Sequence, residues 1–166
     1  MNPHAPEQLP FFVYGTLLPG QPNESLWRGC ICKAEPAYIH NCQLFDMGHY
    51  PMLVPQKAGI VAGQLITVDR SVYEEILSRL DALEEFFPEQ PEQSTYYRVC
   101  KKVTTEDGQQ WDAWIYEGDL HLIDGMPRIV SGNWLEYVSG KQEEINTWWE
   151  SINTMFGHHR QADLDE

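Results

Sequence analysis

The stretch between Ser71 and Glu84 has the clearest helical periodicity in the chain. Its apolar residues recur at spacings of three and four, which is the pattern of an amphipathic helix with one face on a core. They are Tyr73, Ile76, Leu77, Leu80 and Leu83. Ser71 is followed three residues later by Glu74, which predicts a capping box at the start of the helix. Pro88 predicts that the helix ends near Phe86.

Glu84 departs from the polarity pattern of this helix. At about 100° per residue, its side chain lies roughly 40° from Leu80 and therefore inside the apolar stripe. Glu74, Glu75 and Glu85 lie roughly 120–140° away, on the solvent side. A carboxylate directed at a core must be paired, protonated or in functional use.

Two interpretations of the Glu84 carboxylate remain open from periodicity alone. It could form an ion pair with Arg79 or Arg98 at a frayed helix end, or it could belong to a functional site. The neighbouring Asp81 lies at the edge of the stripe, so we expect it to accept a local hydrogen bond rather than to act as a second acid.

Segments with strand character surround this helix. They cover residues 9–14, 31–44, 59–68, 96–105 and 111–116. Glu106–Gly108 predicts a hairpin turn, and Gly63 predicts a bulge. About six strand segments with one well-formed helix predict an α+β fold, a small mixed β-barrel or twisted sheet with flanking helices.

The end of the chain predicts a second helix and a polar tail. We expect this helix over residues 142–155, with Trp148 and Trp149 packing it onto the core. The prediction is a single domain over residues 9–156, with flexible termini at residues 1–8 and 157–166.

Composition and charge restrict the classes of partner. The chain has 166 residues, 42% of them hydrophobic, which suits one folded domain. Its formal net charge of −14 disfavours nucleic acid and anionic membrane surfaces. No apolar run approaches the length of a membrane span, and the first residues lack the pattern of a signal peptide. We therefore expect a cytoplasmic protein.

Four cysteines raise the question of disulfides or a metal. In a cytoplasmic chain, Cys30, Cys32, Cys42 and Cys100 are expected to be buried thiols. With His40, the first three could form a zinc site, but their spacing is not that of the usual zinc motifs. The prediction is therefore no metal.

A glycine follows the first strand segment directly, in the sequence Tyr14-Gly15-Thr16-Leu17. Glycine allows a sharp turn that leaves successive backbone N–H groups unpaired, and such groups form a concave anion site. Thr16 adds a hydroxyl group. The competing interpretation is an ordinary β-turn that contains a glycine.

Several motifs occur in a fixed order. They are Tyr14-Gly15-Thr16-Leu17, His49-Tyr50-Pro51-Met52-Leu53-Val54, Leu80-Asp81-Ala82-Leu83-Glu84, Tyr97-Arg98, Ala113-Trp114-Ile115-Tyr116 and Ser131-Gly132-Asn133-Trp134. In this order they resemble the gamma-glutamylcyclotransferase superfamily, in particular its small gamma-glutamylamine-cyclotransferase-like branch. The resemblance covers roughly residues 11–134. It implies a small mixed β-barrel with flanking helices.

The resemblance also implies an activity. In this family the α-amine of a gamma-glutamyl group attacks the γ-carbonyl, which yields 5-oxoproline and a released amine or amino acid, without a metal or organic cofactor. Glu84 aligns with the family's catalytic glutamate and would act as general acid and base. The backbone of Gly15, Thr16 and Leu17 would bind the substrate's α-carboxylate.

Further details of the site also follow from this resemblance. Tyr14 and Tyr116 would form walls of the site. Two features depart from the family pattern, because Glu85 stands where glycine is frequent and the loop from Pro88 to Ser94 is long and acidic. The resemblance does not identify the leaving amine. The alternative function is a non-catalytic module that binds a small ligand on the same fold.

Overall fold

A computed structural model of the chain describes the backbone of residues 8–162 and the side chains of residues 8–152. Its six strands form one sheet. They are β1 (Phe11–Val13), β2 (Ile31–Asp46), β3 (Pro51–Val68), β4 (Tyr97–Thr105), β5 (Gln110–Glu117) and β6 (Arg128–Ile129). The strand order is β3-β1-β5-β4-β2-β6, and a further pairing between β2 and β3 closes the first five into a barrel. Because β1 runs parallel to β5 while the other pairs are antiparallel, the predicted mixed barrel is confirmed.

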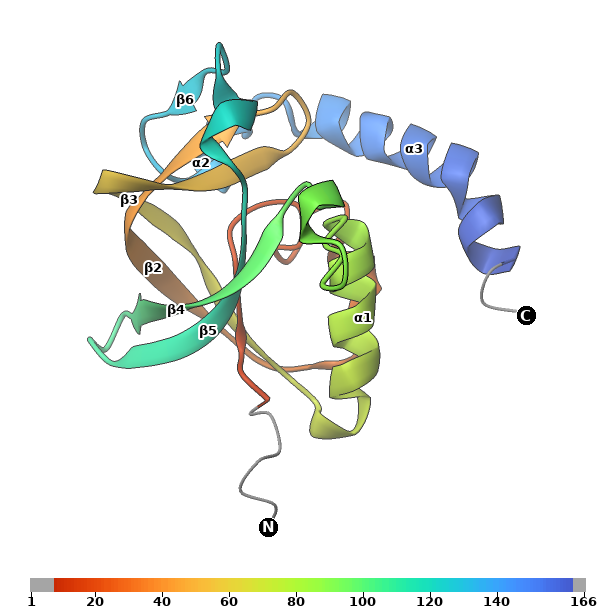
Figure 1. Cartoon of the computed structure of the whole chain (residues 1–166), viewed down its shortest axis with the longest axis horizontal. Helices are drawn as coiled ribbons and strands as arrows, with labels where there is room; N and C mark the ends of the chain where they lie inside the picture. Colours follow the sequence, from red (N-terminus) through yellow and green to blue (C-terminus); the bar gives the residue numbers. More distant parts are fainter. Residues whose placement is uncertain (1–7, 163–166) are drawn as a thin grey trace.

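Helices flank this barrel. They are α1 (Tyr73–Leu83), the short α2 (Trp134–Tyr137) and α3 (Gln142–Ala162), with 3₁₀ turns at Glu24–Leu26, Arg70–Val72, Pro91–Gln93 and Leu120–Ile123. Figure 1 shows α1 against one side of the barrel and α3 extending away from it. Helix α3 begins where predicted but continues past residue 155, into the segment for which we expected a flexible terminus. Residues 1–7 and 163–166 lie outside the described part. Among the described helices, none combines the length and the apolarity needed to cross a membrane.

The long hairpin of β2 and β3 forms much of the barrel wall. The two strands have 16 and 18 residues, so β3 begins well before the predicted start at Gly59. The prediction of a bulge at Gly63 was wrong, because Gly63 pairs regularly with Ala37. A Cβ at Gly63 would lie 2.1 Å from the carbonyl oxygen of Val13, so glycine is needed there for close packing of the strands. The register shifts lie elsewhere on β2, between Ile31 and Lys33 and between His40 and Cys42.

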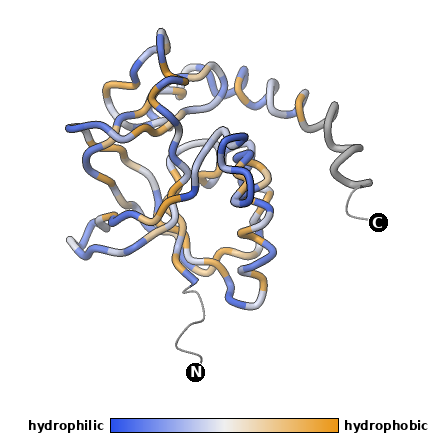
Figure 2. The backbone as a smooth tube through the Cα atoms, in the orientation of Figure 1, coloured by the Kyte–Doolittle hydropathy of each residue, from blue (hydrophilic) through white to orange (hydrophobic). Residues whose placement is uncertain are grey.

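Helix α1 has the predicted apolar face but different ends. Tyr73, Ile76 and Leu80 are buried, and Figure 2 shows hydrophobic and hydrophilic stretches alternating along this helix. The predicted capping box was wrong, because Asp69 accepts hydrogen bonds from both the N–H and the hydroxyl of Ser71, at 2.8 and 2.6 Å. This side chain starts a 3₁₀ turn ahead of the helix.

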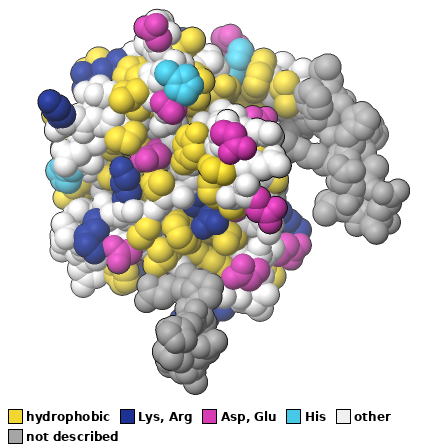
Figure 3. Space-filling view, in the orientation of Figure 1, with side chains coloured by type: hydrophobic (Ala, Val, Ile, Leu, Met, Phe, Trp, Pro, Cys, Tyr) yellow, Lys and Arg dark blue, Asp and Glu magenta, His cyan; other side chains and the backbone are white. Residues whose placement is uncertain are grey.

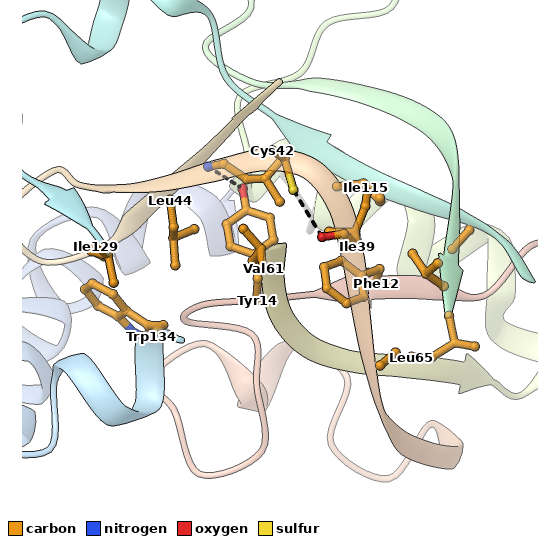
Figure 4. Close-up of a cluster of buried hydrophobic side chains, with 14 of the residues drawn as sticks. Phe12, Tyr14, Ile39, Cys42, Leu44, Val61, Leu65, Ile115, Ile129 and Trp134 are labelled. Atoms are coloured by element: carbon orange, nitrogen blue, oxygen red, sulfur yellow. Dashed lines mark hydrogen bonds between the residues drawn. The ribbon is translucent and has the colours of Figure 1, made fainter. Parts of the chain in front are cut away.

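Two groups of buried side chains form the core. One fills the barrel, and Figure 4 shows part of it, including Tyr14, Cys42 and Trp134. The other lies between the barrel and α1 and includes Phe11, Trp27 and Ile76. The first group fixes the barrel, and the second fixes the position of α1 on it.

The four cysteines are free thiols, as expected, but they differ in burial. Cys42 is buried in the barrel, Cys30 is half-buried, and Cys32 and Cys100 are exposed. The expectation of buried thiols was therefore wrong for Cys32 and Cys100, because alternate residues of a strand face opposite sides and these two face solvent. Within residues 8–152, no three His, Cys, Asp or Glu side chains are placed to share a metal ion.

Candidate active site

A cavity of about 470 Å³ opens beside the end of β1. Its lining comes from the loop after β1, the start of β3, the end of α1, the segment before β4, the end of β5 and the middle of α3. The lining residues are Phe12, Val13, Tyr14, Gly15, Thr16, Leu17, Asn23, Tyr50, Pro51, Leu83, Glu84, Glu85, Thr95, Tyr96, Tyr116, Trp148, Trp149 and Ile152. All six residues that the sequence singles out for the site lie in this cavity: Tyr14, Gly15, Thr16, Leu17, Glu84 and Tyr116.

The loop after β1 presents free backbone donors to the cavity. Its turn is closed by a hydrogen bond from the N–H of Leu18 to the carbonyl of Gly15, at 3.0 Å. For the N–H groups of Gly15, Thr16 and Leu17, we find no acceptor within the described residues. A Cβ on Gly15 would lie 2.5 Å from Cγ of Pro51. Glycine is therefore required here by the close approach of β3, and the loop has the open donors of an anion site.

Asn23 holds this loop from behind and was not found from the sequence. Its side-chain amide donates to Oγ1 of Thr16 at 2.9 Å, and its N–H donates to the carbonyl of Thr16 at 2.8 Å. Because Oγ1 of Thr16 acts as the acceptor in the first bond, its own proton is available for another partner. A single asparagine seven residues beyond the loop gives no periodic signal that could have identified it.

Glu84 directly follows α1 and is its C-terminal cap residue. Its N–H donates to the carbonyl of Leu80 at 3.0 Å, which carries the helical phase one residue past Leu83. The side chain is half-buried and lines the cavity. Burial, and secondarily the charge of Glu85, raises the pKa of Glu84 from its ordinary value of 4.5 to about 8.

The two arginines considered as partners of Glu84 are paired elsewhere. Arg98 Nε contacts Asp81 Oδ1 at 2.9 Å, and Arg79 contacts Glu75 at 2.5 Å. The ion-pair interpretation of Glu84 was therefore wrong, and no hydrogen-bond partner of its carboxylate is found in residues 8–152. Asp81 accepts hydrogen bonds, but its side-chain partners are Arg98 and Tyr116, so the expectation of a local bond was wrong.

Tyrosine hydroxyl groups brace the cavity wall. Tyr14 donates to the carbonyl of Tyr116 at 2.6 Å, and Tyr116 donates to Oδ1 of Asp81 at 2.6 Å. Tyr96 donates to the carbonyl of Pro51 at 3.0 Å. Burial raises the pKa of each of these three hydroxyls. They therefore remain protonated, and their hydrogen bonds hold the three tyrosine rings in place around Glu84.

Glu85 is exposed to solvent but also lines the cavity. Its φ of 53° lies in the left-handed region, beyond the end of α1. The helical phase of α1 therefore no longer sets the direction of the Glu85 side chain. Thr95 Oγ1 donates to Oε2 of Glu85 at 2.7 Å, and Thr95 N–H donates to the Glu85 carbonyl at 3.1 Å. None of the residues from Pro88 to Ser94 lines the cavity.

The middle of α3 forms an outer wall that was not predicted. Trp148 stacks on the ring of His49 at 4.7 Å, and Trp149 Nε1 donates to the carbonyl of His49 at 2.9 Å. Both indoles line the cavity, together with Ile152. We expected these two tryptophans to pack the helix onto the core, which holds for Trp149, but the sequence does not show that they also face a cavity.

Comparison with known proteins places the site in a family. Residues 11–136 match the family described as gamma-glutamyl cyclotransferase, AIG2-like. This chain belongs to that family. The gamma-glutamylcyclotransferase family protein ytfP of Citrobacter rodentium is 33% identical over 125 residues, which are 75% of this chain and 94% of that protein. The protein of the same name from Escherichia coli K12 is 34% identical over 125 residues, 75% of this chain and 95% of its own.

A solved family structure has the same fold. The crystal structure of an AIG2-like protein from Mus musculus is 24% identical and has a TM-score of 0.55, with 72% of this chain and 84% of that chain covered. At this identity the likeness concerns the fold alone. The cyclotransferase family match includes all six predicted site residues and ends before α3 begins at Gln142.

Proposed function

We propose that this cyclotransferase family member releases 5-oxoproline from a gamma-glutamyl amine or a gamma-glutamyl amino acid, with Glu84 as general acid and base. The observation that carries the proposal is a half-buried carboxyl group for which the described side chains supply no partner, in one cavity with a loop whose backbone N–H groups are open within the same residues. The first feature suits proton transfer, and the second suits a carboxylate ligand.

The loop after β1 positions the glutamyl part of the substrate. The N–H groups of Gly15, Thr16 and Leu17 bind the α-carboxylate, and the Thr16 hydroxyl adds a donor. The α-amine then lies beside Glu84. Holding the amine against the γ-carbonyl of the same molecule removes much of the entropic cost of the reaction.

Glu84 moves the proton that the reaction must transfer. An α-ammonium group cannot attack, so a base must first remove its proton. Because burial raises the pKa of Glu84 to about 8, this carboxylate is a stronger base than an ordinary glutamate and its pKa lies closer to that of the amine, which favours the proton transfer. At neutral pH the ionised fraction of Glu84 is the minor one, so turnover rises as the pH approaches 8.

The bond changes are those of an intramolecular acyl transfer. The neutral α-amine nitrogen attacks the γ-carbonyl carbon, and a carbon–nitrogen bond closes the five-membered ring. The bond from the same carbon to the leaving nitrogen then breaks. Glu84 gives its proton to that nitrogen, then takes the second proton of the ring nitrogen and passes it to the released amine. The products are 5-oxoproline and an ammonium ion, and Glu84 is again ionised for the next cycle.

Replacement of the carboxyl group tests this proposal. We expect Glu84→Gln to reduce kcat for 5-oxoproline release by roughly 10²–10⁴-fold, which is the usual contribution of a general acid–base group. The assay measures 5-oxoproline from a panel of gamma-glutamyl compounds between pH 6 and 9. The matched control is Glu74→Gln, an exposed glutamate of the same helix that does not line the cavity.

Two results would contradict the proposal. One is wild-type turnover by Glu84→Gln. The other is thermal stabilisation of the wild-type protein by gamma-glutamyl compounds without any release of 5-oxoproline, which would favour a binding module on the same fold.

A further inference from the structure

We infer that the outer part of the cavity, bounded by Glu85, Tyr50, Trp148 and Trp149, selects a leaving amine that carries a second ammonium group and no carboxylate. The preferred substrates are then gamma-glutamyl derivatives of diamines. This inference rests on the proposed function and specifies the substrate class of the same site.

The charges around the cavity favour a cation in the leaving group. The lining residues include two glutamates, Glu84 and Glu85, and no Lys, Arg or His among those described. The loop after β1 offers donors for one carboxylate. A leaving amino acid would place its own carboxylate beside Glu85, where like charges repel. The net charge of −14 adds to this repulsion.

Glu85 is fixed with its carboxylate at the cavity. Its positive φ is a conformation that glycine adopts freely and a glutamate adopts at a cost. Two hydrogen bonds to Thr95, one to the backbone and one to the side chain, hold it there. The Glu85 carboxylate therefore has a defined position at the cavity, where an ammonium group can pair with it.

Aromatic rings complete this part of the cavity. The indoles of Trp148 and Trp149 meet at 89° with their centroids 4.9 Å apart, and Tyr50 lies 6.5 and 6.3 Å from them. After burial, the charge of Glu85 contributes most to the raised pKa of Tyr50, which places this carboxylate and the aromatic corner in the same part of the cavity. Ammonium groups bind well where aromatic faces and a carboxylate adjoin.

This aromatic corner comes mainly from a helix outside the family match. The match ends at residue 136, and α3 begins at Gln142. Figure 1 shows α3 leaving the barrel after α2, and Figure 3 shows acidic side chains gathered on the side of the molecule where α1 lies. The family portion therefore supplies the reaction site, and α3 supplies the wall that faces the leaving amine.

Three matched substrates test the inference. They are the gamma-glutamyl amides of 1,4-diaminobutane, of n-pentylamine and of 4-aminobutyrate, whose leaving groups end in an ammonium, a methyl and a carboxylate group. We expect kcat/KM for the diamine amide to exceed that for the pentylamine amide by about ten-fold or more, with the aminobutyrate amide lowest. Added salt should reduce the preference for the diamine.

Variants locate the source of this preference. Glu85→Gln and Trp149→Leu should each move the ratio of diamine to pentylamine turnover toward one, whereas Glu74→Gln should keep the wild-type ratio. Glu85→Gly serves as a second variant, because glycine tolerates the φ of this position and should fold. Thermal melts confirm that each variant is folded.

The outcomes separate this inference from the proposed function. Release of 5-oxoproline from all three amides without a preference for the diamine overturns the inference and leaves the function intact. The same change of ratio in Glu74→Gln and Glu85→Gln also overturns it, because the preference would then come from overall charge. Absence of 5-oxoproline from every amide overturns the proposed function, and with it the inference.

Discussion

At the scale of single residues, Glu84 combines a structural cost with a chemical use. Its carboxyl group lies on the apolar face of α1 and is half-buried, while both nearby arginines are paired with other acids. Neutralising this group by protonation is the way to bury it without a cation. The same environment gives it a pKa of about 8, within reach of the pKa of an amine.

This cost should appear in the pH dependence of stability. The pKa of Glu84 is about 8 in the folded protein against 4.5 for the ordinary group. Between these values the unfolded chain loses its proton while the folded protein retains it. The free energy of unfolding therefore falls as the pH rises through this window, and the loss is complete above pH 8.

A comparison with Glu84→Gln isolates this effect. We expect the variant to gain stability relative to the wild type between pH 5 and pH 9, by about 1–3 kcal/mol once solvent screening of a half-buried group is allowed for. Urea denaturation at several pH values measures it. Parallel stability curves for the two proteins would show that Glu84 titrates normally.

At the scale of elements, the short strand β1 connects the barrel to the site, so the packing of β1 in the barrel sets the position of the loop that follows it. It has three residues and leads into the loop that carries Gly15. On one side it pairs with β3, where Gly63 permits close approach to Val13. The position of the donor loop therefore depends on a glycine in the barrel wall.

Gly63→Ala should displace β1. The added methyl group would lie 2.1 Å from the Val13 carbonyl oxygen and 2.9 Å from the Phe12 ring, so backbone must move. We expect a loss of stability of about 2–4 kcal/mol and a raised KM. Thermal or urea denaturation and steady-state kinetics measure these effects. The control is Gly140→Ala, where the methyl group meets no atom within 4 Å; equal effects of both substitutions would contradict the role of Gly63.

At this scale, sequence patterns predicted the elements better than their ends. Residues 71–84 have a strong helical period, so α1 and the direction of Glu84 were predictable. The start of α1 was not, because Asp69 competes with Ser71 for the first free N–H groups and periodicity does not show which side chain wins. Strands β2 and β3 are longer than predicted. Prolines and glycines within them suggest breaks, but they are tolerated where the register of the two strands shifts or where another backbone comes close to a glycine.

At the scale of the whole molecule, α3 belongs to both the core and the site. Ile145 is buried in the barrel cluster, and Trp149 packs against that cluster while lining the cavity. These contacts join positions more than 100 residues apart, which no local pattern in the sequence reveals. The donor loop and Glu84 were predictable because each has a local signature, and the α3 wall was not.

Truncation tests the contribution of α3. A chain that ends at residue 141 loses Ile145 and both indoles, so we expect it to lose several kcal/mol of stability and most of its preference among leaving amines. A chain that ends at residue 156 keeps these side chains and should match the full chain, consistent with a domain over residues 9–156. Thermal melts and the three-substrate assay compare them; a wild-type preference after truncation at residue 141 would show that α3 is not part of the site.

The span of the cavity lining also bears on biosynthesis. The lining runs from Phe12 to Ile152, so a ribosome must release nearly the whole domain before the last wall can dock. A nascent chain holds the donor loop and Glu84 long before it holds the indoles. Selectivity should therefore emerge only at the end of translation, and a product terminated before α3 would discriminate less among leaving amines than the full chain.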